Sequence, residues 1–298
     1  MSKKTTTARL SVYSNSFLIA IKAIVGFAIG SVSIISEAMH STMDLLASVI
    51  NFYSVKMADR KPDNEHPYGH GKFENISGVI EALLIFFAAG WIIYEAIERI
   101  VNPKEIEHIG IGFIVMLGSA IINFFVSRRL YKVARETDSI ALEADALHLK
   151  TDIYTSLGIA IGLLLMWITG YRLLDSIAAL MVAVLIIRQS YLLLIKAFSP
   201  LLDTTLPDEE LNIIKEAIAR KKYGCIDFHQ LRSRKAGNMK YVDLHLVMPQ
   251  DYSVKDSHAI CDAIEKEIES YIKNIEVHIH VEPCNKTCET CEQFNPTV

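Results

Sequence analysis

The sequence predicts an α-helical membrane protein with six transmembrane helices, followed by a cytosolic α+β domain. Its composition is 51% hydrophobic and its mean hydropathy is +0.27, which is more apolar than an ordinary soluble domain. The apolar residues form long runs up to about residue 200, whereas the composition after Asp203 is that of a soluble domain. The net charge of -4 and the pI near 6.2 give no indication of a nucleic-acid partner.

Six segments are long enough to cross about 30 Å of hydrocarbon at about 1.5 Å per residue. They cover residues 10–34, 36–57, 76–100, 109–130, 140–169 and 173–198. The second and fifth are too polar to face lipid, so we expect them to be neighbours inside the bundle, shielded by the other four. The polar residues of the second are Glu37, His40, Asp44 and Asn51, and those of the fifth are Glu143, Asp145, His148, Lys150 and Asp152.

The Lys and Arg residues of the short loops predict the orientation of these helices. One side of the membrane carries eleven of them and the other side three, which places both termini in the cytosol. The N-terminal residues MSKKTTTARL lack the apolar core and the cleavage site of a secretory signal. We therefore expect the first segment to remain in the mature protein.

The C-terminal third predicts two helices and three strands in the order αββαβ. A helix begins near Pro207 with an acidic first turn and ends near residue 221, and a second covers residues 253–272 with Ser253 as its cap. The strand candidates are 225–235, 240–248 (KYVDLHLVM, with period two) and 275–281. This order allows an antiparallel sheet covered by two helices. The expected parts are 1–202, 203–283 and a Cys-rich tail, 284–298.

Two H-x-x-x-D strings lie on the polar second and fifth helices: His40 with Asp44, and His148 with Asp152. Residues four apart share a helix face, so two facing helices would offer four nitrogen and oxygen ligands to a divalent metal. In the alternative reading, the His and the Asp of each pair would only satisfy each other's hydrogen-bonding groups inside the helix bundle. An empty, deprotonated site would hold two carboxylates at low dielectric, and histidine titrates near about pH 6.5, so metal and protons would compete there. This competition is the basis of a metal/proton exchanger.

The loop after the second helix is a second metal candidate. Asp63, His66 and His70 lie within eight residues and could bind one ion, with Glu65 as a fourth or bridging ligand. The alternative is a polar loop with solvated histidines.

The C-terminal third carries further candidate ligands. On spacing alone, its histidines are better explained as exposed strand residues. All five cysteines lie in this third, where disulfides are not expected in the cytosol, and the tail string C-x3-C-x2-C suits zinc, Cu(I) or cadmium. Its alternative is a disordered tail with free thiols. The candidates are His229, His245, His258, His278, His280 and Glu282, and in the tail Cys284, Cys288 and Cys291.

Together these residues resemble the cation diffusion facilitator family of divalent-metal/proton antiporters. The resemblance covers nearly the whole chain, includes the loop string HPYGHGKFE and implies a ferredoxin-like cytosolic domain. It further implies a homodimer tied by a Lys–Asp interlock at Lys72 and Asp203. The implied sites are a transport site (His40, Asp44, His148, Asp152), a loop site (Asp63, His66, His70) and cytosolic zinc positions (His229, His245, His258, His280, and Glu282, where many members have Asp).

Two His and two Asp ligands resemble the zinc-preferring branch of that family. We therefore expect a homodimeric exporter in the inner or plasma membrane that exchanges cytosolic zinc for protons by alternating access, with further zinc regulating it from the cytosolic domain. Cadmium, iron, cobalt and manganese are alternative substrates. The rivals are a membrane-anchored metal sensor without flux and a membrane metalloenzyme, which the absence of an HExxH string disfavours.

Overall fold

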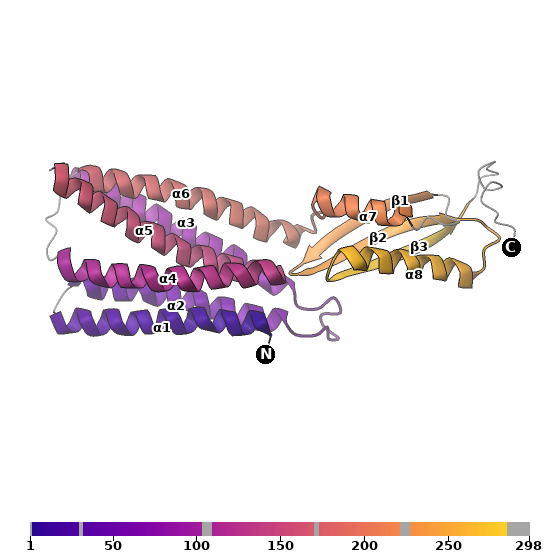
Figure 1. The fold of residues 1–298 in the computed structure, drawn as a ribbon, viewed down its shortest axis with the longest axis horizontal. Helices are drawn as coiled ribbons and strands as arrows, with labels where there is room; N and C mark the ends of the chain where they lie inside the picture. Colours follow the sequence, from indigo (N-terminus) through magenta and orange to yellow (C-terminus); the bar gives the residue numbers. More distant parts are fainter. Residues whose placement is uncertain (1, 30–31, 103–108, 170–172, 221–226, 285–298) are drawn as a thin grey trace. The chain divides into compact units, whose positions relative to one another are not determined.

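The computed structural model describes residues 2–29, 32–102, 109–169, 173–220 and 227–284 (Figure 1). The chain divides into two compact units, Met1–Ser199 and Pro200–Val298. Each unit is described by itself.

The first unit is built from six long helices, as predicted. The first four extend past the predicted segments at one end or both, because polar residues continue the helices beyond the hydrocarbon, whereas the last two have the predicted bounds. Thus the first helix begins at Lys3 rather than residue 10, and the fourth continues to Thr137 rather than residue 130. The helices are α1 (Lys3–Ile29), α2 (Val32–Ala58), α3 (Lys72–Val101), α4 (Ile109–Thr137), α5 (Ile140–Thr169) and α6 (Leu173–Phe198).

Hydropathy supports a membrane location for these helices. Within the described residues, three stretches are long and apolar enough to cross a membrane: Lys3–Val25, Lys72–Glu98 and Ser176–Leu202. Large apolar side chains of α3 and α6, among them Phe87, Trp91 and Val184, are exposed on the surface of this unit. Such a surface suits lipid rather than water.

The packing of the bundle brings α2 against α5, as the polar sequences of these helices predicted. α3 packs closely on α5 and α6 at Gly78, where an added Cβ would lie 3.0 Å from Ala197 Cβ and 3.4 Å from Ile140 Cγ1. The small residues Ala82 and Ala144 continue this contact in a buried apolar cluster. The polar starts of α3 and α5 are thereby held side by side.

The second unit has the predicted order of elements: α7 (Asp208–Arg220), β1 (Asp227–Ala236), β2 (Met239–Met248), α8 (Val254–Tyr271) and β3 (Ile275–Pro283). The sheet order is β1-β2-β3. The expectation of a fully antiparallel sheet is wrong: β1 pairs antiparallel with β2, but β3 pairs parallel with it. The connection between β2 and β3 explains this difference. α8 crosses over and returns the chain to the end of the sheet at which β2 begins, so β3 runs in the same direction as β2.

One face of this sheet is covered and carries the core. Side chains of α7 and α8, such as Ile214, Ile218 and Ile264, pack against Leu244 and Leu246 of β2. Ser253 caps α8, its hydroxyl accepting the backbone N–H of Asp256 at 3.2 Å. Alternation of the strands places every second residue of β2 and β3 on the other face, where the histidines lie.

Candidate metal centres

The contact between α2 and α5 creates a buried cluster of ligands. Oxygen and nitrogen atoms of Asp44, His148 and Asp152 lie within 4.8 Å of one another. The imidazole Nε2 of His148 lies 3.1 Å from Asp44 Oδ1, and these two residues are only 9% and 8% exposed. The backbone of His40 lies in α2, but its side chain lies outside the described part of the structure. Three of the four predicted ligands are therefore brought together.

Polar side chains of α1 surround this cluster. Asn15 Nδ2 donates to Ser48 Oγ at 2.7 Å and to the backbone oxygen of Asp44 at 3.4 Å. Lys22, also buried, donates from Nζ to Ser41 Oγ at 2.7 Å. These contacts fix the face that α2 presents to α5.

The loop between α2 and α3 holds the second cluster: Asp63, His66 and His70, with ligand atoms within 4.8 Å. His70 Nε2 lies 3.2 Å from Asp63 Oδ2, and His66 Nδ1 lies 3.4 Å from Asp63 Oδ1. Gly69, with φ of +81°, provides the left-handed turn that folds the two imidazoles toward each other, their ring centroids 4.5 Å apart. The carboxylate of Glu65 is not part of this cluster.

Backbone donors tune the carboxylate of this loop. Asp63 Oδ1 accepts the backbone N–H groups of His66 at 2.7 Å and of Glu65 at 3.1 Å. The donation from His66, assisted by the nearby imidazole of His70, lowers the pKa of Asp63. The loop thus presents an ionised carboxylate beside two imidazoles.

The open face of the sheet carries the third cluster: His229, His245 and Glu282. Glu282 lies between the two imidazoles, with Oε1 2.7 Å from His245 Nδ1 and Oε2 3.3 Å from His229 Nε2. The hydrogen bond with His245 is the main reason why the pKa of Glu282 is lowered. The pairing of the strands produces this cluster, since His229 lies opposite His245 and His245 opposite His280.

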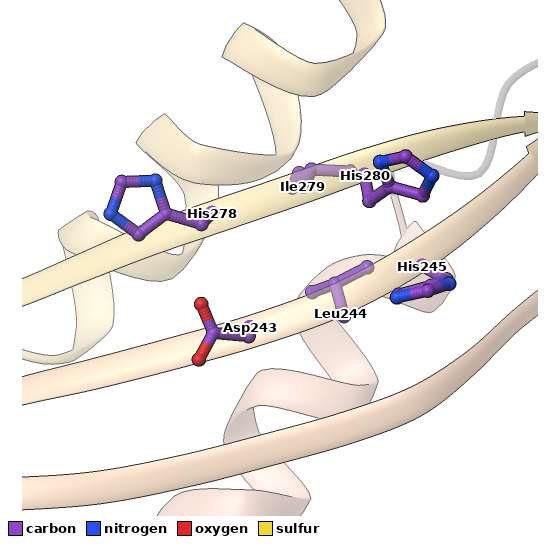
Figure 2. Close-up of a pocket in the computed structure, with 6 residues that line it drawn as sticks. All are labelled: Asp243, Leu244, His245, His278, Ile279 and His280. Atoms are coloured by element: carbon purple, nitrogen blue, oxygen red, sulfur yellow. The ribbon is translucent and has the colours of Figure 1, made fainter.

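A pocket on this face, drawn in Figure 2, extends the cluster along β2 and β3. Its lining residues include His245 and His280, whose ring centroids lie 4.8 Å apart, and then Asp243 and His278 farther along the same strands. His280 Nε2 lies 3.9 Å from Glu282 Oε1, so it borders the cluster. His278 and His280 both line this pocket and share this face of the sheet, since they are two residues apart in β3.

Two family models match this chain. The cation efflux transmembrane domain matches residues 8–202, and the cytoplasmic domain of cation efflux proteins matches residues 206–284. The chain belongs to the cation diffusion facilitator, or cation efflux, family. It is an integral membrane transporter with a cytoplasmic C-terminal dimerisation domain, and not an enzyme, which removes the metalloenzyme alternative.

Relatives of this cation efflux protein align over nearly their whole length. An uncharacterized transporter of Synechocystis sp. is 32% identical over 90% of this chain and 87% of its own. The cation-efflux pump FieF of Shewanella oneidensis is 29% identical over 93% of each. Among solved structures, the metal-bound C-terminal domain of the CzcD transporter from Thermotoga maritima is 28% identical, covering 28% of this chain and 100% of that one, with a TM-score of 0.25.

Some residues predicted for the cation efflux transporter lie apart from these clusters. His258 is exposed on α8 and lies 3.6 Å from Asp262 instead of joining Glu282. Lys72 begins α3 in the first unit, and Asp203 lies in the second, 3.7 Å from Arg234. Their interlock stays a prediction. Of the tail cysteines, Cys284 is a half-buried thiol that forms no disulfide within the described residues, whereas Cys288 and Cys291 lie outside them.

Sequence reasoning missed four buried polar residues of the helices that form or border the buried cluster of Asp44, His148 and Asp152 in this cation efflux protein. Lys22, Asn15 and Glu81 were not singled out, and Asp145 was given no role. The sequence feature that could have identified them is their position inside apolar helices, where polar side chains are energetically costly and usually functional. The sequence did not show which of them face α2 and α5.

Proposed function

We propose that this transporter exports zinc from the cytosol in exchange for protons, as a homodimer in the inner or plasma membrane with both termini cytosolic. Residues 1–202 would transport, 203–283 would bind regulatory metal and form the dimer, and 284–298 would form the tail. The observation that carries the proposal is the buried cluster of Asp44, His148 and Asp152 between α2 and α5.

The geometry of His148 supports a competition between metal and proton at this site. Its Nε2 faces Asp44 Oδ1 at 3.1 Å, an arrangement that requires a proton between the two atoms. A metal ion needs the lone pair of the same nitrogen, so binding releases the proton. An imidazolium between Asp44 and Asp152 would thus occupy the place of the cation during the return step.

The ligand set favours zinc among the divalent ions. Imidazole nitrogen with carboxylate oxygen suits a tetrahedral, borderline cation better than manganese, which prefers oxygen ligands. Cadmium, iron and cobalt bind similar donors, so competition against zinc is part of the test.

Zinc held by the cytoplasmic domain would regulate transport. His229, His245, His280 and Glu282 supply three imidazoles and one carboxylate, which fit zinc, and Asp63, His66 and His70 supply a smaller set in the loop. Zinc that binds one conformation more tightly than another shifts the equilibrium between them. The Lys72–Asp203 interlock would tie the two subunits, and the tail thiols would be a further metal site.

The test is zinc uptake into proteoliposomes under an imposed pH gradient, with cadmium, manganese, iron and cobalt as competitors. Wild type is compared with Asp44→Asn and Asp152→Asn, and with Asp251→Asn in the exposed turn after β2 as the matched control. Zinc flux should be lost when the pH gradient is removed. It should also be lost in Asp44→Asn and Asp152→Asn, but not in Asp251→Asn. Zinc binding without flux in the wild type would overturn the proposal in favour of a sensor.

A further inference from the structure

Glu81 of α3 is a buried carboxyl group that has no role in the transport cluster, as we call the proposed site formed by Asp44, His148 and Asp152. It is 2% exposed, and within the described residues neither of its side-chain oxygens has a hydrogen-bond partner. It does not belong to the cluster of metal ligands. The charged groups that act on it are Asp145 and His148, both on α5.

Asp145 is equally buried, at 1% exposure, but its surroundings differ. Its Oδ1 accepts the hydroxyl of Ser11 at 2.9 Å and that of Ser48 at 3.4 Å. Donors from α1 and α2 therefore stabilise a negative charge on Asp145, and among the described residues no such donor reaches Glu81. The two carboxyl groups have the same chemistry but unequal support for ionisation.

Within the described residues, the polar groups of α2 and α6 nearest to α3 form hydrogen bonds elsewhere and none with the side chain of Glu81. α6 contributes Ser190, whose hydroxyl donates to the backbone oxygen of Ala82 at 2.6 Å, and α2 contributes Asn51, which donates to the backbone of Ala141. The contact of α3 with α5 and α6 also contains the apolar cluster that includes Ile85, Ala144, Leu147 and Ile186. An ionised Glu81 beside an ionised Asp145 would place two like charges in an apolar interior.

We propose that Glu81 is a second proton-binding site, paired with Asp145 and separate from the metal ligands. Glu81 holds a proton while the transport cluster lacks metal, and Asp145 is the anion of the pair. When a divalent cation enters, the O–H bond of Glu81 breaks and its proton leaves to solvent. This inference rests on the proposed exchange at Asp44, His148 and Asp152.

The change in charge at the transport cluster gives the direction of this coupling. Before metal binds, two carboxylates and one imidazolium carry a net negative charge. Afterwards the same carboxylates, a neutral imidazole and a divalent ion carry none, so the potential at Glu81 becomes more positive. A more positive potential favours the ionised carboxylate, and metal binding therefore expels the proton.

The experiment counts protons released per zinc bound, using full-length protein in weakly buffered nanodiscs with a pH indicator dye. A His66→Ala, His245→Ala background weakens the loop and sheet sites so that the transport cluster dominates. Glu81→Gln keeps the shape of the neutral acid, and Glu95→Gln on the same helix, half-buried, is the matched control. We expect Glu81→Gln to bind as much zinc as the background protein but to release roughly one proton fewer per ion. We also expect the Glu95→Gln control to release as many protons per zinc ion as the background protein.

Equal proton release from the Glu81→Gln variant and its parent would overturn the inference. If the parent itself bound no zinc, the proposed transport site would fail instead, so the two failures are distinguishable. Asp145→Asn provides a second test should Glu81→Gln not fold. It removes the repelling charge, so Glu81 is ionised before metal arrives and proton release again falls. Unchanged release from a folded Asp145→Asn protein would also overturn the inference.

Discussion

The ammonium group of Lys4 lies 2.7 Å from Oε1 of Glu74, joining the starts of α1 and α3 inside the protein. Lys4 is 7% exposed and Glu74 is fully buried. Asp59, just after α2, lies 3.2 Å from the same ammonium, and Ser139, just before α5, donates to Glu74 Oε2 at 2.5 Å. One buried ion pair therefore connects the ends of four helices on the side of the bundle where the chain begins.

Replacing Lys4 with Met should destabilise the protein strongly. The change leaves Glu74 buried without its cation, a loss that costs about 3–5 kcal/mol for comparable pairs. Lys3→Met is the matched control, because Lys3 forms an exposed ion pair with Glu136 that is worth at most about 1 kcal/mol. Thermal unfolding in detergent measures both. Equal melting temperatures for the two variants would contradict a structural role for the buried pair.

Gly78→Ala should also destabilise the bundle, by about 1–3 kcal/mol, because the new methyl group would press on Ala197 and Ile140. Gly90 lies on the same helix, but a Cβ there meets no atom within 4 Å in the described structure. Gly90→Ala should therefore be neutral or slightly stabilising, since Ala is the better helix former. The same unfolding assay compares the variants. A Gly78→Ala protein as stable as Gly90→Ala would mean that α3 and α6 can separate at no cost.

Patterns within one segment predicted the elements well, and contacts between segments account for what was missed. Hydropathy located the six helices, and the period of KYVDLHLVM located β2. The direction of β3 depends on the path of α8 across the sheet, which local alternation does not encode. His258 matches a zinc position that the resemblance to the family implies, yet on α8 it lies 3.6 Å from Asp262. Glu81 could not be assigned because its significance depends on Asp145, which belongs to another helix.

Acidification should weaken zinc binding at the loop site without protonating Asp63. The lowered pKa of Asp63 lies below its ordinary value of 3.8, so this carboxylate stays ionised and its stabilising contacts persist until the pH falls through that lowered value. Histidine is the side chain that binds protons between about pH 5 and 8. Zinc affinity at this site should therefore decrease on acidification with a slope, in protons per ion, to which Asp63 does not contribute.

This slope is measured by zinc titrations between pH 5 and 7 on an Asp44→Ala, His245→Ala background, which weakens the other two clusters. Asp63→Asn should lower the affinity at every pH while leaving the slope unchanged. Loss of slope in Asp63→Asn would show that the carboxylate, contrary to its hydrogen bonding, is a competing proton acceptor.

Zinc should stabilise the cytoplasmic domain through Glu282, and chelation should reverse the effect. Glu282 contacts His245 and His229 and is adjacent to His280, so it is the shared neighbour of three imidazoles. A ligand at 100 times its Kd stabilises the folded state by about 2.7 kcal/mol. Glu282→Gln should lose most of this gain, because an amide cannot supply the negative charge that the cation requires.

Glu276→Gln is the matched control, since Glu276 lies on the same strand and contacts His278 at 3.1 Å but does not belong to the cluster. The readout is the shift in the unfolding temperature of the full-length protein on adding zinc and then EDTA. A zinc-induced shift that survives in Glu282→Gln and disappears in Glu276→Gln would place the metal at the other end of the pocket, beside Asp243 and His278.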